Sequence, residues 1–232
     1  MNIQGKVAVV TGVSKGIGLA TVKALAEEGA IVFGIGRTAP DFKHPNFSFM
    51  PCNVSNPEAV AQAFEAIFKK THNTIHVLIN NAGVGFSGKM HETKIEDWKE
   101  MFDTNVHGVF YCSRLAIPKM IAQQEGHIIN IASIAGKSGL ENFSGYCGSK
   151  FAVRGISESL FKEYRNDGIK VSCIYPGSVM TNFFDNIDGI TANENMMMPE
   201  DIACTIVDLL ETSANYLPAE IEVRPLMPAG RK

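Results

Sequence analysis

Short apolar segments alternate along the chain with longer segments in which apolar residues recur every three or four positions. The short segments are rich in β-branched residues, and the one at 75–80 is almost wholly apolar, as expected of a strand buried on both faces of a sheet. We therefore predict strands at 6–11, 30–36, 47–50, 75–80, 127–132, 169–175 and 220–224.

Helical spacing fills the gaps between these strands. Ser55 and Glu58 are read as a capping box before a helix that runs to about Lys70, and Thr93 and Glu96 as caps of another helix. Further helices are predicted from the first glycine-rich loop to about residue 29, over 101–123, over a segment that holds Tyr146 and Lys150, and from Pro199 onward. This alternation predicts an α/β fold in which helices cover both faces of a doubly wound parallel sheet, as a single domain over residues 1–232.

Composition narrows the class of protein. With 232 residues, of which 45% are hydrophobic and 19% charged, the chain can bury one substantial core. A formal net charge of −3 and lysines that are spread singly, apart from Lys69-Lys70, argue against nucleic acid or a membrane as a partner. The five cysteines form no Cys-x-x-Cys pair and the six histidines no close cluster, so we expect no disulfide framework, no metal site and a cytoplasmic location.

A glycine-rich loop follows the first strand directly and leads into a helix. Its sequence is Gly12-Val13-Ser14-Lys15-Gly16-Ile17-Gly18. Glycines let the backbone approach a pyrophosphate, and the N–H groups at the helix start face the anion. The spacing Gly-x-x-x-Gly-x-Gly departs from the commoner Gly-x-Gly-x-x-Gly, but its position between strand and helix predicts a dinucleotide site. We expect the cofactor to contact Gly12, Ser14, Lys15, Gly16, Ile17 and Gly18.

The end of the second strand indicates which dinucleotide is bound. An NAD-selective site usually has a carboxylate there for the ribose 2′-hydroxyl, whereas this chain has Gly36 followed by Arg37. A guanidinium suits a 2′-phosphate, and Lys15 adds a second positive charge. We therefore predict NADP(H), with Asp41 as the alternative ligand of a free hydroxyl.

Tyr146 and Lys150 stand four residues apart where a new amphipathic segment begins, so on a helix their side chains share one face. Free tyrosine has a pKa of about 10, too high for easy ionisation at neutral pH. A cation about 4 Å away at an effective dielectric near 20 would favour the phenolate by roughly 4 kcal/mol, or about 3 pKa units. The pair therefore predicts proton transfer to or from a carbonyl or alcohol oxygen, with a lowered Tyr146 pKa.

Other polar or small residues stand at strand ends, where parallel sheets meet their ligands. Asn80-Asn81-Ala82-Gly83 closes the fourth predicted strand, Ser133 the fifth, and Pro176-Gly177 the sixth. Asn105 lies within the long apolar-periodic segment that follows the fourth strand.

Together these motifs resemble the short-chain dehydrogenase/reductase family over essentially the whole chain. They are Thr11-Gly12-x-x-x-Gly16-Ile17-Gly18, Asn80-Asn81-Ala82-Gly83, Asn105, Ser133, Tyr146-x-x-x-Lys150 and Pro176-Gly177-Ser178-Val179-x-Thr181. The resemblance implies a Rossmann-like fold and a catalytic tetrad of Asn105, Ser133, Tyr146 and Lys150.

The resemblance also implies what these residues do. Ser133 would hold the carbonyl oxygen, Tyr146 would donate the proton, Lys150 would lower the tyrosine pKa and bind the nicotinamide ribose, and Asn105 would hold a water. The family usually has an aspartate at the position of Asn53, beside Val54 at the adenine. The remaining implied cofactor contacts are Asn81, Ala82, Gly83, Tyr146, Lys150, Pro176, Gly177, Val179 and Thr181.

Residues 182–198 follow the sixth strand and mix apolar side chains with Asn, Asp and Gly. The apolar ones include Phe183, Phe184, Ile187 and Ile190. We predict that this segment is a mobile wall of the substrate pocket, to which Phe143, Phe183 and Phe184 contribute. In the alternative, these side chains pack on the last helix.

The leading function is therefore an NADP(H)-dependent oxidoreductase acting on an apolar or aromatic carbonyl compound or secondary alcohol. One alternative is a 3-oxoacyl-carrier-protein reductase, whose acidic partner would need a basic rim such as Lys89, Lys137 and Arg154. An alternative of another class is a regulatory protein that senses the dinucleotide without turnover. The apolar segments 101–123 and 147–166 further predict a homodimer or homotetramer.

Overall fold

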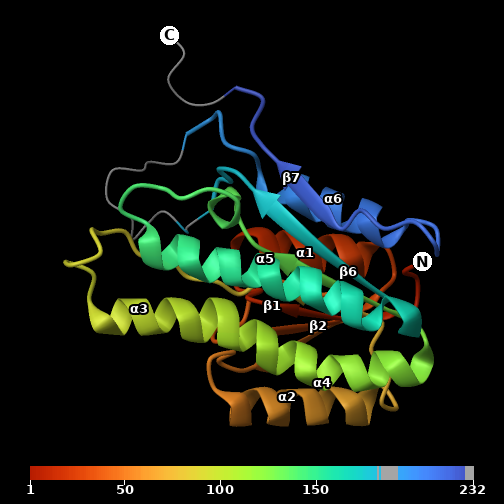
Figure 1. Cartoon of the computed structure of the whole chain (residues 1–232). Helices are drawn as coiled ribbons and strands as arrows, with labels where there is room; N and C mark the ends of the chain where they lie inside the picture. The colour runs from red at the N-terminus through yellow and green to blue at the C-terminus, as the bar shows by residue number, and fades with distance from the viewer. Residues whose placement is uncertain (182, 184–192, 228–232) are drawn as a thin grey trace.

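The computed structural model describes residues 1–181, 183 and 193–227. Within them, seven parallel strands form one sheet in the order β3-β2-β1-β4-β5-β6-β7 (Figure 1). The strands are β1 (Val7–Thr11), β2 (Ile31–Gly36), β3 (Phe47–Pro51), β4 (Val77–Asn80), β5 (Gly126–Ile131), β6 (Ile169–Pro176) and β7 (Glu220–Val223). The predicted doubly wound parallel sheet is confirmed.

Helices cover both faces of this sheet, with α1 and α6 on one face and α2, α4 and α5 on the other (Figure 1). The α-helices are α1 (Gly16–Glu27), α2 (Pro57–Lys70), α3 (Ile95–Phe102), α4 (Gly108–Gln123), α5 (Ser144–Tyr164) and α6 (Pro199–Leu210). The described part of the chain also contains the π turn η1 (Asp103–His107) and the 3-10 turns η2 (Ile134–Gly136) and η3 (Arg165–Asp167). None of these helices is both long and apolar enough to cross a lipid bilayer.

Side chains of the central strands point alternately to the two faces of the sheet, and each face has its own hydrophobic core. Val10 of β1 packs in the core under α1 and α6, whereas its neighbour Val9 packs in the core under α2 and α4. Ile79 and Leu78 divide in the same way in β4. Because successive side chains of a strand point to opposite faces, a strand covered on both sides must be apolar at every position.

The two predicted capping motifs are wrong in detail. Asn56, rather than Ser55, caps α2, and its side-chain oxygen accepts a hydrogen bond from the Ala59 N–H at 2.7 Å. Pro57 explains this, because the residue before a proline is held extended while proline itself suits the first helical position. At α3 the N-cap is Lys94, and the Thr93 hydroxyl donates instead to the Lys89 carbonyl at 3.0 Å.

The carboxyl ends of all seven strands share one edge of the sheet, and the strand order reverses between β1 and β4. A parallel sheet opens its ligand crevice at such a point. Beyond β6, Val179 forms a parallel bridge with Met197, which places the segment before α6 at this same edge. Phe184, Ile187 and Ile190 lie outside the described residues.

Candidate active site

The glycine-rich loop packs tightly against the end of β4. Gly12 has φ +72°, and a Cβ there would lie 2.8 Å from the Ala82 Cα. Gly18 lies even closer to its neighbours, because a Cβ there would be 2.2 Å from the Gly12 carbonyl oxygen. Only glycine allows both approaches, so the loop is held as a compact cradle.

The Thr11 hydroxyl links the end of β1 to the residues that follow β4 by hydrogen bonds. Its hydroxyl oxygen accepts hydrogen bonds from the backbone N–H groups of Asn81 and Ala82, both at 3.0 Å. The Asn81 side chain donates in return to the carbonyls of Thr11 at 2.9 Å and Gly12 at 3.1 Å. Asn81 therefore shapes the crevice through protein contacts, while Gly83 beside it is exposed.

The start of α1 is open to an anion. Lys15 is the N-cap residue and is exposed, and its side chain makes no capping bond. The N–H groups of a first helical turn have no partner within the helix and suit a phosphate. Thr181, in the segment that follows β6, approaches the loop, with its Cγ2 3.1 Å from where a Cβ on Gly16 would lie. These features fit the diphosphate of a dinucleotide between the loop and Thr181.

Arg37, the cation predicted to bind a 2′-phosphate, lies directly after the end of β2. It is exposed, and its Nη1 lies 3.7 Å from a carboxylate oxygen of Glu100 on α3. Val54 is buried against the start of α4, where a Cβ on Gly108 would meet its Cγ2 at 3.0 Å. Asn53 is exposed, and its side-chain oxygen accepts from the Ser55 N–H at 3.2 Å.

Ser133 and Tyr146 come together although 13 residues separate them. Ser133 follows β5 and caps η2, where its hydroxyl oxygen accepts from the Ala135 N–H at 3.1 Å. Tyr146 stands in the first turn of α5. Burial raises the pKa of Tyr146 to about 12, and a hydrogen bond with the Ser133 side chain offsets part of that rise. Tyr146 is therefore protonated at neutral pH and can act as an acid.

Lys150 lies one turn further along α5 and is only 5% exposed. Its ammonium donates to the Ile131 carbonyl oxygen at 2.9 Å and lies 5.8 Å from the centre of the Tyr146 ring. Burial lowers the pKa of Lys150 to about 8. The expected lowering of the Tyr146 pKa is therefore not found, because burial of the phenol outweighs a cation that is directed to a backbone carbonyl.

Asn105 stands in the π turn between α3 and α4 and is 1% exposed. Its amide donates to the Val84 carbonyl and to the Ser149 hydroxyl, each at 2.9 Å, and its oxygen accepts from the Val84 N–H at 2.9 Å. The Ser149 hydroxyl donates in turn to the Tyr146 carbonyl at 2.7 Å. Asn105 thus ties the loop after β4 to the helix that carries the tyrosine. Its expected water contact stays a prediction.

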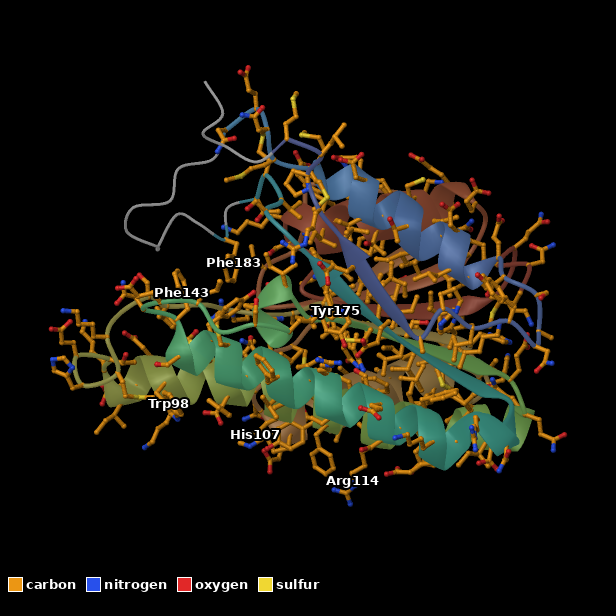
Figure 2. The ribbon with its side chains drawn as sticks, turned by 45° about the horizontal axis from the view of Figure 1, so that its top comes forward. Trp98, His107, Arg114, Phe143, Tyr175 and Phe183 are labelled. Carbon is orange, nitrogen blue, oxygen red and sulfur yellow. The ribbon has the colours of Figure 1, made fainter. Side chains whose placement is uncertain are left out.

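Aromatic rings surround Tyr146 at the outer end of the crevice. The ring centres of Phe183 and Phe143 lie 5.3 Å and 6.4 Å from that of Tyr146. Figure 2 shows Phe143 and Phe183 at the same end of the molecule, near the start of α5. The substrate pocket predicted from Phe143, Phe183 and Phe184 stays a prediction, and Phe184 lies outside the described residues.

Comparison with known proteins decides the family. The family model of the short chain dehydrogenases matches residues 6–189. An uncharacterized oxidoreductase of Staphylococcus aureus strain USA300 is 35% identical over 233 residues, which cover 95% of this chain and 97% of the relative. The chain belongs to the short-chain dehydrogenase family.

Solved structures of such enzymes superpose closely on this one. A metagenomic short-chain oxidoreductase in complex with NADP has a TM-score of 0.82 at 29% identity, covering 98% of this chain and 100% of the other. The 3-ketoacyl-(acyl-carrier-protein) reductase of Brucella melitensis, complexed with NADH, has a TM-score of 0.88 at 23% identity, covering 97% and 98%. The second likeness concerns the fold alone. This short-chain dehydrogenase is thus an oxidoreductase with a Rossmann-like single domain.

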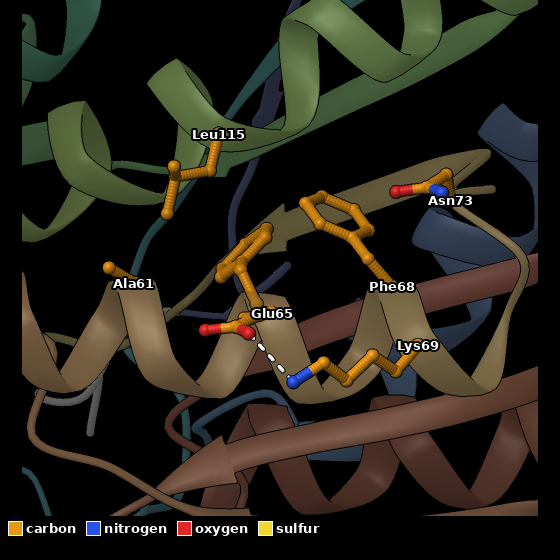
Figure 3. A pocket seen from close by; sticks show the side chains of 7 residues that line it. Ala61, Glu65, Phe68, Lys69, Asn73 and Leu115 are labelled. Atoms are coloured by element: carbon orange, nitrogen blue, oxygen red, sulfur yellow. Dashed lines mark ion pairs between the residues drawn. The ribbon is translucent and has the colours of Figure 1, made fainter.

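A cavity elsewhere in this short-chain dehydrogenase has no comparable chemistry. It measures about 320 Å³ and lies between α2 and α4, where Phe68 and Leu115 line it (Figure 3). Its charged groups, Lys69 and Glu65, pair with each other at 2.7 Å. Among the described residues, no group of three or more His, Cys, Asp or Glu side chains could hold a metal ion.

Sequence reasoning missed several residues that shape the site. These are Thr11, Gly85, Glu100 and Ser149. Thr11 and Ser149 stood inside recognised motifs, and only their hydrogen bonds distinguish them from neighbours. Glu100 carries no signal in the sequence, because its contact with Arg37 joins residues 63 positions apart.

Proposed function

We propose that this short-chain dehydrogenase transfers a hydride between NADP(H) and an apolar carbonyl compound or secondary alcohol. The observation that carries the proposal is the convergence at the carboxyl edge of the sheet of Ser133, a Tyr146 that is protonated at neutral pH, and the buried ammonium of Lys150, 5.8 Å from the Tyr146 ring centre. When bound, the nicotinamide supplies the hydride chemistry.

The protein's own part is to hold an oxygen and move a proton. The hydroxyls of Ser133 and Tyr146 would both hydrogen-bond the carbonyl oxygen, which fixes its position and direction. Tyr146 then donates its proton to that oxygen as negative charge develops there. With a pKa of about 8, Lys150 can exchange a proton near neutral pH, and its positive charge stabilises the phenolate that remains.

A panel of ketones, aldehydes and secondary alcohols with NADPH and NADP⁺ tests this function. Turnover of apolar members would support it. A dinucleotide-sensing protein would instead bind the cofactor and turn over no member of the panel. The assembled Ser133, Tyr146 and Lys150 favour the enzyme, because a sensor has no need of a buried acid beside a cation.

The acyl-carrier-protein alternative is weaker than the sequence suggested. Lys137 pairs with Glu222 at 3.1 Å, and Arg154 pairs with Glu220 at 2.9 Å. These carboxylates offset two of the three expected positive charges, and Lys89 alone makes a poor docking rim for an acidic partner.

Preference for NADP(H) rests on Arg37 and Lys15, which are both exposed at the expected ribose end of the crevice. The NADP complex of the metagenomic relative also supports it. We expect Arg37→Ala to raise the KM for NADPH by roughly 10- to 100-fold, because a hydrogen bond to a charged group contributes about 1.5–3 kcal/mol. The KM for NADH should change by less than about twofold.

Steady-state kinetics with both cofactors measure this difference. Arg114→Ala is the matched control, because it removes another exposed guanidinium, on α4. Equal use of NADPH and NADH by the native enzyme, or an equal rise of both constants in Arg37→Ala, would contradict the assignment.

We also propose that the enzyme is a homodimer or homotetramer formed through α4 and α5. Phe110 on α4 is 51% exposed and Phe151 on α5 is 42% exposed, which is unusual for large apolar side chains on the outer layer. Light scattering should give a particle of two or four times 25.2 kDa. Introducing Phe110→Glu and Phe151→Glu together should shift it to the monomer, whereas Tyr216→Glu, at a residue 61% exposed outside both helices, should not.

A further inference from the structure

Gly85 provides space for an aromatic ring beside the catalytic tyrosine. It is buried, two residues after Gly83. A Cβ at this position would lie 2.4 Å from the Cζ of Phe183 and 3.1 Å from the Cδ2 of Tyr146. The phenyl ring of Phe183 can therefore lie against the backbone of Gly85 only because residue 85 has no side chain.

The space so formed is shaped for a planar ring. Its walls are the Gly85 backbone and the Tyr146 ring, which Phe183 meets at a centroid distance of 5.3 Å and an angle of 48°. Phe143 meets Tyr146 edge-on at 69°. Val84, Phe86 and Met101 pack around the same group. We call the space between the Gly85 backbone and the Tyr146 ring, which the Phe183 ring occupies, the aryl slot.

The present position of Phe183 conflicts with the proposed chemistry. Tyr146 must bring its hydroxyl within hydrogen-bond reach of a substrate oxygen. Yet Tyr146 is 9% exposed and Phe183 packs on its ring. A substrate that reaches the hydroxyl from this side must therefore take space that the Phe183 ring now fills.

We propose that the aryl slot binds the aromatic ring of an aryl ketone or of the matching 1-aryl alcohol, and that Phe183 competes for the slot in the free enzyme. Gly85 then determines specificity, because any side chain there would close the slot. In an aryl ketone the ring is bonded directly to the carbonyl carbon, so a ring in the slot leaves the carbonyl oxygen beside Tyr146. This inference rests on the proposed function and names its substrate class.

An aromatic ring has an advantage over an aliphatic group of the same size. Displacing Phe183 breaks its ring contacts with Tyr146, and only a flat π-system restores them in offset or edge geometry. A cyclohexyl group is thicker and lacks the complementary charge distribution of a ring face and edge. Selectivity should therefore appear between acetophenone and cyclohexyl methyl ketone, which differ in little else.

Three variants test binding in the aryl slot and competition by Phe183 separately. Phe183→Ala should lower the KM for acetophenone by about tenfold, because the internal competitor is gone. Gly85→Ala should raise it by about tenfold or more, with a smaller effect on cyclohexyl methyl ketone. Gly139→Ala should change neither constant, because no atom lies within 4 Å of a Cβ at that position.

A binding measurement gives a readout independent of turnover. Trp98 is the only tryptophan, and its ring lies 3.1 Å from where a Cβ on Gly145 would be, next to Tyr146 in the chain. Quenching of Trp98 fluorescence by acetophenone in the presence of NADP⁺, which allows no reduction, should give Kd values that follow the same order as the KM values. Melting temperatures check that each variant folds, and Phe183→Leu replaces Phe183→Ala if that variant does not.

The outcomes distinguish the two proposals. A higher KM for acetophenone in Phe183→Ala would make Phe183 a fixed wall and overturn the competition. Equal handling of the two ketones by the native enzyme would overturn the aryl slot, even if the proposed reaction occurs. Conversely, acetophenone binding that Gly85→Ala abolishes, without reduction of any carbonyl compound, would leave the slot standing and reject the proposed function.

Discussion

Tyr146→Phe is expected to lower kcat by about 10²–10⁴-fold, the range that a positioned general acid contributes. The substitution removes one hydroxyl and keeps the ring, so the packing with Phe143 and Phe183 is retained. Ser133 loses its hydroxyl partner, but its bond from the Ala135 N–H still holds it in place. Cofactor affinity should therefore stay within about twofold, which fluorescence titration with NADPH can measure.

Tyr216→Phe is the matched control, because Tyr216 is 61% exposed and outside the crevice. It should keep native kinetics. If Tyr146→Phe retained more than about a tenth of the native kcat, the proton would have to come from another group and the mechanism would fail.

Gly18→Ala should have the largest effect on the protein itself. Its Cβ would lie 2.2 Å from the Gly12 oxygen and 2.6 Å from the Asn81 Nδ2. Neither neighbour can yield, since one is backbone and the other is held by two hydrogen bonds to the end of β1. We expect a loss of about 3 kcal/mol in the free energy of unfolding, together with loss of dinucleotide binding.

Denaturant unfolding and cofactor titration measure the two effects. Gly139→Ala, where a Cβ meets open space, should change the stability by less than about 0.5 kcal/mol. If Gly18→Ala had the same free energy of unfolding as the native protein, the loop would be able to move and accommodate the added Cβ.

The fold could be predicted from the sequence because the spacing of apolar residues that distinguishes strands from helices is visible within short segments. β1 and β4 are apolar at nearly every position, and that pattern fits only a sheet covered on both faces. The same logic placed Ser133 at a strand end and Tyr146 at a helix start. Since the carboxyl ends of parallel strands share an edge, their meeting at the crevice followed from topology.

What the sequence could not predict depends on burial and on distant contacts. The pKa of Tyr146 was expected to fall, because a lysine four residues away is visible in the sequence whereas the covering Phe183 is not. Gly85 looks like any loop glycine until the ring of Phe183 is placed against it. The predicted mobile wall around Phe184 stays a prediction.

The π turn at Asp103–His107 explains how the two halves of one long helical segment, α3 and α4, pack against different elements of the fold. Before it, α3 packs on α5, and after it, α4 packs on β4, β5 and α2. In an uninterrupted helix from 95 to 123, the directions of all side chains would be fixed by 3.6 residues per turn. A π turn contains one extra residue, so it rotates the side chains of α3 about the helix axis relative to those of α4. Deleting one residue from this turn would therefore rotate α3 by about 100° relative to α4 and turn its contact face away from α5.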